Sequence, residues 1–372
     1  MINEFFYQVG EYQTYSKIDA FLAANRDWNR VHFNFMESTF AHRPWTRPTE
    51  SWSELMRRRC QELRDRYSYL RLWFSGGWDS STVLHSFIEN GIPIDELAIY
   101  DRQFFDGDSE VAPAIEYAKW IQQQYLPRVR LQFIPIGVDH SEQIYDRYGS
   151  QWILTPGCSL MFPKTHRYFM EQELDAFAPV RSDSDRIGNI WAHDKPKVML
   201  WDNKWYSFQV DASMIGHFKT DCELFFCTAS MPELYIQQTH MAIDFFEAQM
   251  LSNNRVDTEL SHRTQSHQGQ DYAIWNQALG RTHCIDNASA LYGLMKSTMG
   301  HFPMGGVSRK SYLHHRDINS RHYHIYREGI KTVEELTGIA IPDSGSGWIP
   351  NILSDRYFVR PLDPRLSQGK TA

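Results

Sequence analysis

The most regular pattern of apolar and polar positions lies between residues 68 and 140, where it predicts alternating strands and helices. Three short apolar runs, of the length and composition of buried strands, occupy residues 70–74, 96–100 and 130–136. Between these runs, apolar side chains recur every three or four positions, which is typical of helices with one buried face. Strands and helices that alternate in this way predict an α/β fold with a Rossmann-like parallel sheet and right-handed crossovers.

The flanking segments complete a three-part organisation. Residues 1–67 are expected to form a helical N-terminal lead-in. Residues 68–230 are assigned to the α/β domain that contains the parallel sheet. Residues 231–372 are expected to form a mostly helical C-terminal region that binds the substrate.

Local signals predict three further elements outside the alternating pattern. Ser51 is a suitable N-cap for a helix that continues through Leu63. Two strand-like runs flank Asp202-Asn203-Lys204 and predict a hairpin. Pro232 is expected to open a long helix, because proline is well tolerated at the first helical position.

Composition and charge then exclude several classes of protein. With 42% hydrophobic and 22% charged residues among 372, the chain has the composition of an ordinary globular protein. No apolar run approaches the roughly 18–20 residues that span a bilayer. The acidic start of the chain does not resemble a signal peptide, so the expected location is the cytoplasm.

The net charge bears on which partners the chain attracts, and the cysteine spacing bears on disulfides and metal or redox pairs. A formal net charge of −7 gives the chain no general attraction to nucleic acid or to an anionic membrane. The five cysteines have neither the spacing of a disulfide framework nor a Cys-x-x-Cys pair. The sequence indicates no particular oligomeric state.

The candidate chemistry is concentrated in the turn between the first strand and the first helix, Ser75-Gly76-Gly77-Trp78-Asp79-Ser80-Ser81. The glycines let a phosphate approach the backbone, and the first turn of a helix offers unpaired N–H groups with a partial positive charge. The serine hydroxyls add donors. A carboxylate beside a phosphate needs an intervening cation, so Asp79 is expected to hold Mg²⁺, directly or through water, or else to orient the loop. The competing interpretation is a plain junction in which Asp79 or Ser80 only caps the helix. The complete motif in its strand–helix context favours phosphate binding.

This motif resembles the signature of the PP-loop ATP pyrophosphatases, an adenine nucleotide alpha hydrolase-like superfamily that includes asparagine, GMP and NAD synthetases. The resemblance covers about residues 68–140. Beyond them the chain is similar in a general way to asparagine-synthase-like and phosphoadenylylsulfate-reductase-like proteins of phages and bacteria. If a phage encodes the chain, this resemblance implies the host cytoplasm as its location. The resemblance implies that Mg²⁺ and ATP bind and that ATP is cleaved between the α and β phosphates. Pyrophosphate would be held by Ser75, Gly76, Gly77, Asp79, Ser80 and Ser81, and adenine and ribose would lie near Tyr100 and Asp101.

Residues that mark particular branches of the superfamily are missing. The last cysteine, Cys284, does not stand in the Glu-Cys-Gly-x-His context of the phosphoadenylylsulfate reductases. Ile2 occupies the position where glutamine-dependent asparagine synthetases have a nucleophilic cysteine. The remaining expectation is an AMP-forming, amidoligase-like enzyme. Such an enzyme adenylates a small-molecule or polymer acceptor, after which ammonia or an amine displaces AMP.

Two other groups of charged residues are candidates for the same site. Asp183 and Asp185 could complete a Mg²⁺ site with Asp79, although a turn with solvated charges is the favoured alternative. Residues 309–331 hold six cations and two anions, a local net charge of +4, and begin with Arg309 and Lys310. These cations would act catalytically by stabilising phosphate charge, or they form a solvated basic face.

Two alternative functions follow from the same features. The first is a nucleotide-binding module that has this fold but does not turn ATP over. The second is a nucleic-acid-modifying enzyme of the same superfamily, in which the basic segment holds the polymer.

The basic segment gives a prediction that separates these functions. If Arg309 and Lys310 contact ATP, the double variant Arg309→Ala/Lys310→Ala slows turnover more than about tenfold, because charged donors to developing phosphate charge contribute several kcal/mol. If they contact nucleic acid, ATP affinity is unchanged and the salt dependence of polymer affinity falls by about one unit per lost contact. ATP affinity and tRNA or DNA affinity are measured on the same preparation. If the double variant changes neither ATP affinity nor tRNA or DNA affinity, Arg309 and Lys310 belong to a solvated face.

Overall fold

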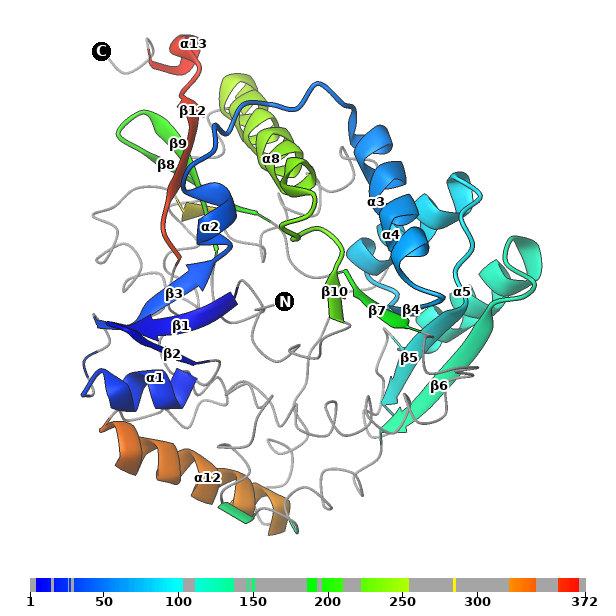
Figure 1. Cartoon of the computed structure of the whole chain (residues 1–372), viewed down its shortest axis with the longest axis horizontal. Helices are drawn as coiled ribbons and strands as arrows, with labels where there is room; N and C mark the ends of the chain where they lie inside the picture. Colours follow the sequence, from blue (N-terminus) through cyan, green and yellow to red (C-terminus); the bar gives the residue numbers. More distant parts are fainter. Residues whose placement is uncertain are drawn as a thin grey trace.

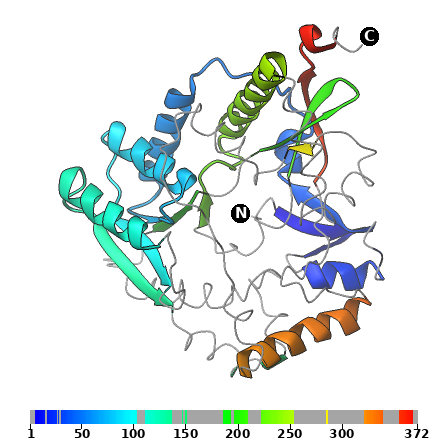
Figure 2. The same cartoon turned by 180° about the vertical axis from the view of Figure 1, so that it is seen from behind.

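The structure is a computed structural model of the full chain, shown in Figure 1 and, from behind, in Figure 2. It describes residues 5–14, 17–25, 27, 30–102, 111–136, 146, 149–150, 186–192, 196–209, 222–253, 284–285, 321–338 and 354–367.

A five-stranded parallel sheet forms the centre of the α/β part, and its strand order is β10-β7-β4-β5-β6. The strands are β4 (Tyr69–Trp73), β5 (Glu96–Arg102), β6 (Arg130–Ile136), β7 (Ile187–Trp191) and β10 (Cys222–Leu224). All four neighbouring pairs are parallel. The predicted α/β fold with a parallel sheet is therefore confirmed.

Three helices pack against this sheet: α3 (Trp52–Arg66), α4 (Trp78–Glu89) and α5 (Val111–Gln124). The connections through α4 and α5 step along the sheet in the same direction, so right-handed crossovers put both helices on the same face. Figures 1 and 2 show α3, α4 and α5 together on the outer side of the sheet. The predicted cap of α3 is confirmed: Ser51 and Glu54 form a reciprocal capping box.

A buried ion pair lies across the middle of the sheet. Arg71 on β4 donates to Glu96 on β5 at 2.8 Å, and both side chains are 1% exposed. Arg71 also donates to Asn189 on β7 at 3.2 Å, and Tyr69 donates to Glu96 at 2.7 Å. Because a one-residue slip would move these charges to the opposite face, the network specifies the register of three adjacent strands.

A second buried network holds the edge strand β10 against α3. Arg59, which is fully buried, donates to the Glu223 carboxylate at 2.8 Å and also to the backbone carbonyls of Leu224 and Phe225. Glu223 accepts further hydrogen bonds from Arg66 and Tyr67. Burial alone raises the pKa of the Glu223 carboxyl, but the charge and hydrogen bonds of these partners outweigh it, and the pKa is lowered.

Two antiparallel sheets lie on the other side of the molecule. One contains β1 (Phe5–Val9), β2 (Tyr12–Thr14) and β3 (His32–Phe35) in the order β2-β1-β3, next to the helices α1 (Lys17–Ala23) and α2 (Glu37–Phe40). The other has the order β11-β8-β9-β12 and contains β8 (Lys197–Trp201), β9 (Lys204–Phe208), β11 (Cys284–Ile285) and β12 (Tyr357–Pro361). The short helix α13 (Pro364–Ser367) follows β12.

A long helix and a cluster of aromatic rings join these parts. Helix α8 (Pro232–Asn253) packs against α3, β8 and α13 (Figure 1). Tyr235 of α8 lies within 6.2 Å, between ring centroids, of Phe35, Phe40 and Trp45. Trp45 in turn stacks on Tyr357 of β12 at 5.3 Å. The N-terminal sheet, α8 and the C-terminal strand therefore share one core.

Helix α12 (Arg321–Thr337) contains the C-terminal half of the basic segment and packs beside α1. Its Arg321 forms an ion pair with Asp146, and its Lys331 lies 3.9 Å from Glu335. These cations are exposed and have carboxylate neighbours within the described residues. Arg309 and Lys310 lie outside the part of the chain that the structure describes.

Some expectations are corrected and others confirmed. The prediction of a helical lead-in over residues 1–67 is wrong in part, because β1, β2 and β3 form a sheet there. The hairpin around Asp202 and Asn203 is confirmed, but it belongs to an antiparallel sheet rather than to the parallel one. Both turn residues have positive φ, as a tight hairpin turn requires.

Among the described helices, none combines the length and apolar character needed to cross a membrane.

The buried ion pair in the sheet gives a stability prediction. Replacing Glu96 with alanine leaves the Arg71 guanidinium buried without its carboxylate, and we expect the free energy of unfolding to fall by about 3–5 kcal/mol. Glu116→Ala is the matched control, because the Glu116 side chain is 73% exposed and its ion-pair partner among the described residues is the neighbouring Lys119 on α5. Its effect is expected to stay within about 0.5 kcal/mol. Urea titrations measure both; equal losses would contradict the assigned role of the pair.

Candidate functional site

The turn that leads from β4 into α4 is short and has a defined backbone conformation. After β4 ends at Trp73, the Phe74 amide still donates to the Ala98 carbonyl of β5 at 2.8 Å. Gly76 then adopts a positive φ of 72°, and Gly77 is the N-cap of α4. A Cβ atom at position 76 would lie 2.4 Å from the Cβ of Ala114 on α5. Both the conformation and the contact with α5 therefore require glycine at this position.

Serine side chains hold the turn together from inside. The buried Ser80 hydroxyl accepts a hydrogen bond from the Ser75 amide at 3.2 Å and lies 3.1 Å from the Ser75 hydroxyl. The Ser80 hydroxyl also donates to the Gly77 carbonyl at 3.2 Å. The Gly77 amide donates to the Ser75 hydroxyl at 3.3 Å. Ser75, by contrast, is exposed, so the turn presents Ser75 to solvent and uses Ser80 as its internal support.

The N-terminus of α4 has no side-chain cap. Gly77 occupies the N-cap position, and no side-chain hydrogen bond is made there. The expectation that Asp79 or Ser80 caps this helix is therefore wrong: the two residues are the second and third residues of the helix itself. The amide groups of a first turn need partners from outside the helix. With glycine at the cap, an anionic ligand can supply them.

The position of this turn in the sheet is also characteristic of a ligand site. It follows β4, the central strand, at the point where the strand order changes direction. β5 and β6 continue on one side of β4, whereas β7 and β10 lie on the other. Open α/β sheets bind ligands beyond the carboxyl ends of the strands at such a switch point.

A row of aromatic rings crosses the same end of the sheet. Trp191 of β7 and Trp73 of β4 stack with a centroid separation of 4.7 Å and an interplanar angle of 7°. Trp73 also stacks on Tyr100 of β5 at 4.9 Å. The Trp73 indole N–H donates to Asn189 at 3.2 Å, which links the row to the buried ion pair. Tyr100, at the end of the row, is half-buried.

Behind the turn, α4 and α5 are joined by a neutral polar pair. His85 Nε2 and the Tyr117 hydroxyl lie 2.6 Å apart, and the Tyr117 ring stacks near Phe74 with centroids 6.3 Å apart. Burial lowers the pKa of the His85 imidazole and raises the pKa of Tyr117 to about 12. Both groups are therefore uncharged near neutral pH, and the pair supports the two helices without adding charge to the site.

The structure brings together eight of the twelve residues predicted from the sequence. Ser75, Gly76, Gly77, Asp79, Ser80 and Ser81 form the turn and the first helical residues, and Tyr100 and Asp101 lie at the adjacent end of β5. Asp79 and Asp101 are half-buried. The Ser81 hydroxyl is buried and, among the described residues, has no hydrogen-bond partner. Asp183, Asp185, Arg309 and Lys310 lie outside the described residues.

Two residues of this region were missed by the sequence analysis. Trp73 was assigned to the first strand only as an apolar residue, and Trp191 was assigned no role. Each of these tryptophans lies at or near the carboxyl end of a strand, and that position is the one sequence signal for a role in the site. The signal becomes informative only when β4 and β7 are known to be neighbours.

Comparison with models of known protein families and with curated proteins gives no match for this chain.

The turn gives a prediction with an internal control. Gly91 and Gly76 both have positive φ, but a Cβ at Gly91 meets no atom within 4 Å. We expect Gly91→Ala to cost about 1–2 kcal/mol of unfolding free energy for the left-handed backbone. Gly76→Ala should cost an additional 1–3 kcal/mol, approximately, from the clash with Ala114. Urea titrations of both variants measure the difference; equal costs would show that the turn tolerates a side chain.

Proposed function

We propose that the chain is an ATP-dependent enzyme that cleaves ATP to AMP and pyrophosphate and adenylates an acceptor. The observation that carries the proposal is the glycine-capped start of α4 at the switch point of a parallel sheet. Helix N-termini of this kind bind phosphate groups through backbone amides and the helix dipole. The serine-supported turn is held in shape before a ligand binds, which reduces the ordering cost of binding.

The parts of ATP are assigned by the chemistry of the surrounding residues. Pyrophosphate contacts the exposed Ser75, the backbone of Gly76 and Gly77, and the first amides of α4. Ser80 and Ser81 are buried, so in this proposal Ser80 acts by shaping the turn and not by direct contact. Adenine and ribose lie at the end of β5, where Tyr100 offers a ring edge and Asp101 a carboxylate.

A Mg²⁺ ion fits this site because Asp79 supplies a carboxylate in the first turn of α4, and hard cations take oxygen ligands. The ion, when bound with ATP, offsets the repulsion between the Asp79 carboxylate and the phosphates. Asp183 and Asp185 are the proposed additional ligands, and Arg309 and Lys310 the proposed cations over the transferred phosphate charge. These four assignments rest on the sequence alone.

The proposed reaction needs no nucleophilic side chain. An oxygen of the acceptor attacks the α-phosphorus of ATP, the bond between the α-phosphorus and the bridging oxygen breaks, and pyrophosphate leaves. Ammonia or an amine then attacks the adenylated carbon, loses a proton to solvent, and AMP departs with the acceptor oxygen. The chain contributes by holding ATP in line with the acceptor and by stabilising the charge of the leaving pyrophosphate.

The proposal predicts a strong effect of Asp79→Asn. This change keeps the shape of the side chain at a half-buried position, so the stability of the fold should change by less than about 1 kcal/mol. ATP cleavage should fall at least about 100-fold, because the carboxylate no longer holds the cation beside the phosphates. Asp202→Asn is the control: Asp202 is exposed in the β8–β9 turn, and asparagine also accepts its positive φ.

The assay follows ATP labelled at the α-phosphate, with Mg²⁺ and a panel of carboxylate acceptors and ammonia. The proposal requires AMP as the labelled product, loss of AMP formation in Asp79→Asn, and wild-type rates in Asp202→Asn. ADP as the product, or equal rates in the two variants, would contradict it. Saturable ATP binding with no product for any acceptor would instead favour the nucleotide-binding module.

A further inference from the structure

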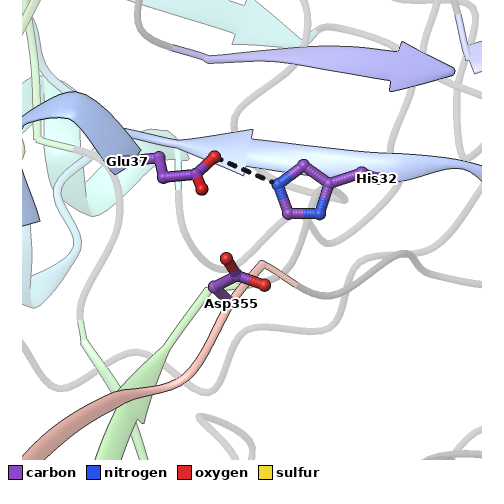
Figure 3. A group of neighbouring side chains, drawn as sticks. All are labelled: His32, Glu37 and Asp355. Atoms are coloured by element: carbon purple, nitrogen blue, oxygen red, sulfur yellow. Dashed lines mark hydrogen bonds and ion pairs between the residues drawn. The ribbon is translucent and has the colours of Figure 1, made fainter. Parts of the chain in front are cut away.

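Three side chains with metal-binding atoms converge at the junction of the N-terminal and C-terminal segments, far from the turn after β4 in the sequence. They are His32 at the start of β3, Glu37 at the start of α2, and Asp355 just before β12 (Figure 3). One ligand atom from each side chain lies within 4.8 Å of the other two. His32 Nε2 and Glu37 Oε2 are the closest pair, 3.3 Å apart.

The surroundings orient the Glu37 carboxylate and hold the segment of Asp355 against β3. Asn34 donates from its amide to Glu37 Oε2 at 3.1 Å, which orients the carboxylate toward His32. On the other side, the Tyr357 hydroxyl donates to the Phe35 carbonyl at 3.1 Å, which ties the segment of Asp355 to β3. Tyr357 belongs to the buried ring cluster with Trp45 and Phe40. The three ligands therefore project from a packed base and not from independent loops.

The His32, Glu37 and Asp355 side chains together have a net negative charge, which favours a bound cation. Two carboxylates face one imidazole, so the group has a net charge of −1 even when His32 is protonated and −2 when it is neutral. Arg356 is the neighbour of Asp355, and its guanidinium carbon lies 4.5 Å from the centroid of the Trp201 ring.

We propose that His32, Glu37 and Asp355 bind a divalent first-row transition ion, with Zn²⁺ as the preferred member. An imidazole with two carboxylates suits this class, whereas Mg²⁺ and Ca²⁺ take oxygen ligands alone. At usual zinc bond lengths, tetrahedral ligand atoms lie roughly 3.3–3.5 Å apart, so the His32–Glu37 separation already fits. Asp355 is exposed and closes the remaining distance by rotation of its side chain.

Such an ion joins segments that are more than 300 residues apart in the sequence. It links β3 and α2 to the strand β12, beside the ring cluster where these segments already pack. Three protein ligands leave a fourth position for water, and the exposed Asp355 keeps that position open to solvent. The ion therefore acts as a cross-link between β3 and α2 in the N-terminal part and the segment that leads into β12.

The test uses the full chain, freed of metal with a chelator and then dialysed against Zn²⁺ in the presence of excess Mg²⁺, which occupies oxygen-only sites. We expect about one tightly held Zn²⁺ per chain and an unfolding temperature raised by several degrees. Asp355→Asn and Glu37→Gln should each weaken Zn²⁺ binding at least about 100-fold, and Asn34→Ala about 10–100-fold through the lost orientation of Glu37. Asp355 is exposed, so its replacement tests the site without threatening the fold.

His42→Ala and Glu50→Gln are the matched controls, because both residues lie nearby in the sequence but outside the group of ligands. They should retain the wild-type Zn²⁺ stoichiometry and thermal shift. Absence of stoichiometric Zn²⁺ in the wild-type chain would overturn the proposal. Unchanged affinity in Asp355→Asn and Glu37→Gln would do the same, since Zn²⁺ would then be bound elsewhere.

Discussion

The register of the parallel sheet depends on the buried ion pair between Arg71 and Glu96. A charge in this position must be paired, because removing a charge from water costs several kcal/mol unless a partner replaces the solvent. Arg71 reaches both neighbouring strands, Glu96 on β5 and Asn189 on β7. The pair therefore sets the alignment of the three central strands. Because these strands are parallel, their carboxyl ends meet at one edge of the sheet, and the rings of Trp73, Tyr100 and Trp191 form a row there.

The candidate site combines a rigid turn with a helix start whose N-cap residue is a glycine. Ser75 and Ser80 form hydrogen bonds with each other within the turn. Gly76 packs against Ala114 so closely that there is no space for a side chain at position 76. Gly77 at the N-cap gives the first amides of α4 no capping side chain. A helix that only needed stability would gain from a serine or aspartate cap, as α3 does with Ser51. The absence of a side-chain cap at α4 is consistent with a ligand in that role.

Residues 35–45 of the N-terminal part and the C-terminal strand β12 meet on the opposite side of the molecule. Phe35, Phe40 and Trp45 pack with Tyr235 of α8 and Tyr357 of β12 in one ring cluster. Aromatic rings bury large areas, so this cluster gives the N-terminal sheet, the long helix and the C-terminal strand a common core. The His32, Glu37 and Asp355 side chains lie at the edge of the same junction. A metal ion there would reinforce contacts that packing has already formed.

The local features of this fold could be predicted from the sequence, because they depend on short-range patterns. The strands and helices from β4 to β6, the capping box of α3 and the turn of the β8–β9 hairpin all have signals within a few residues, and so does the glycine turn after β4. The aromatic run of β1 is a strand signal too, but its five residues are too few for a period to decide between helix and strand. Only the tertiary structure decided which distant segments are neighbours. It placed β7 beside β4, which completed the ring row, and it brought Asp355 to His32 and Glu37. Such contacts arise from burial of apolar surface between segments far apart in the chain, and that driving force is non-directional and leaves no local pattern.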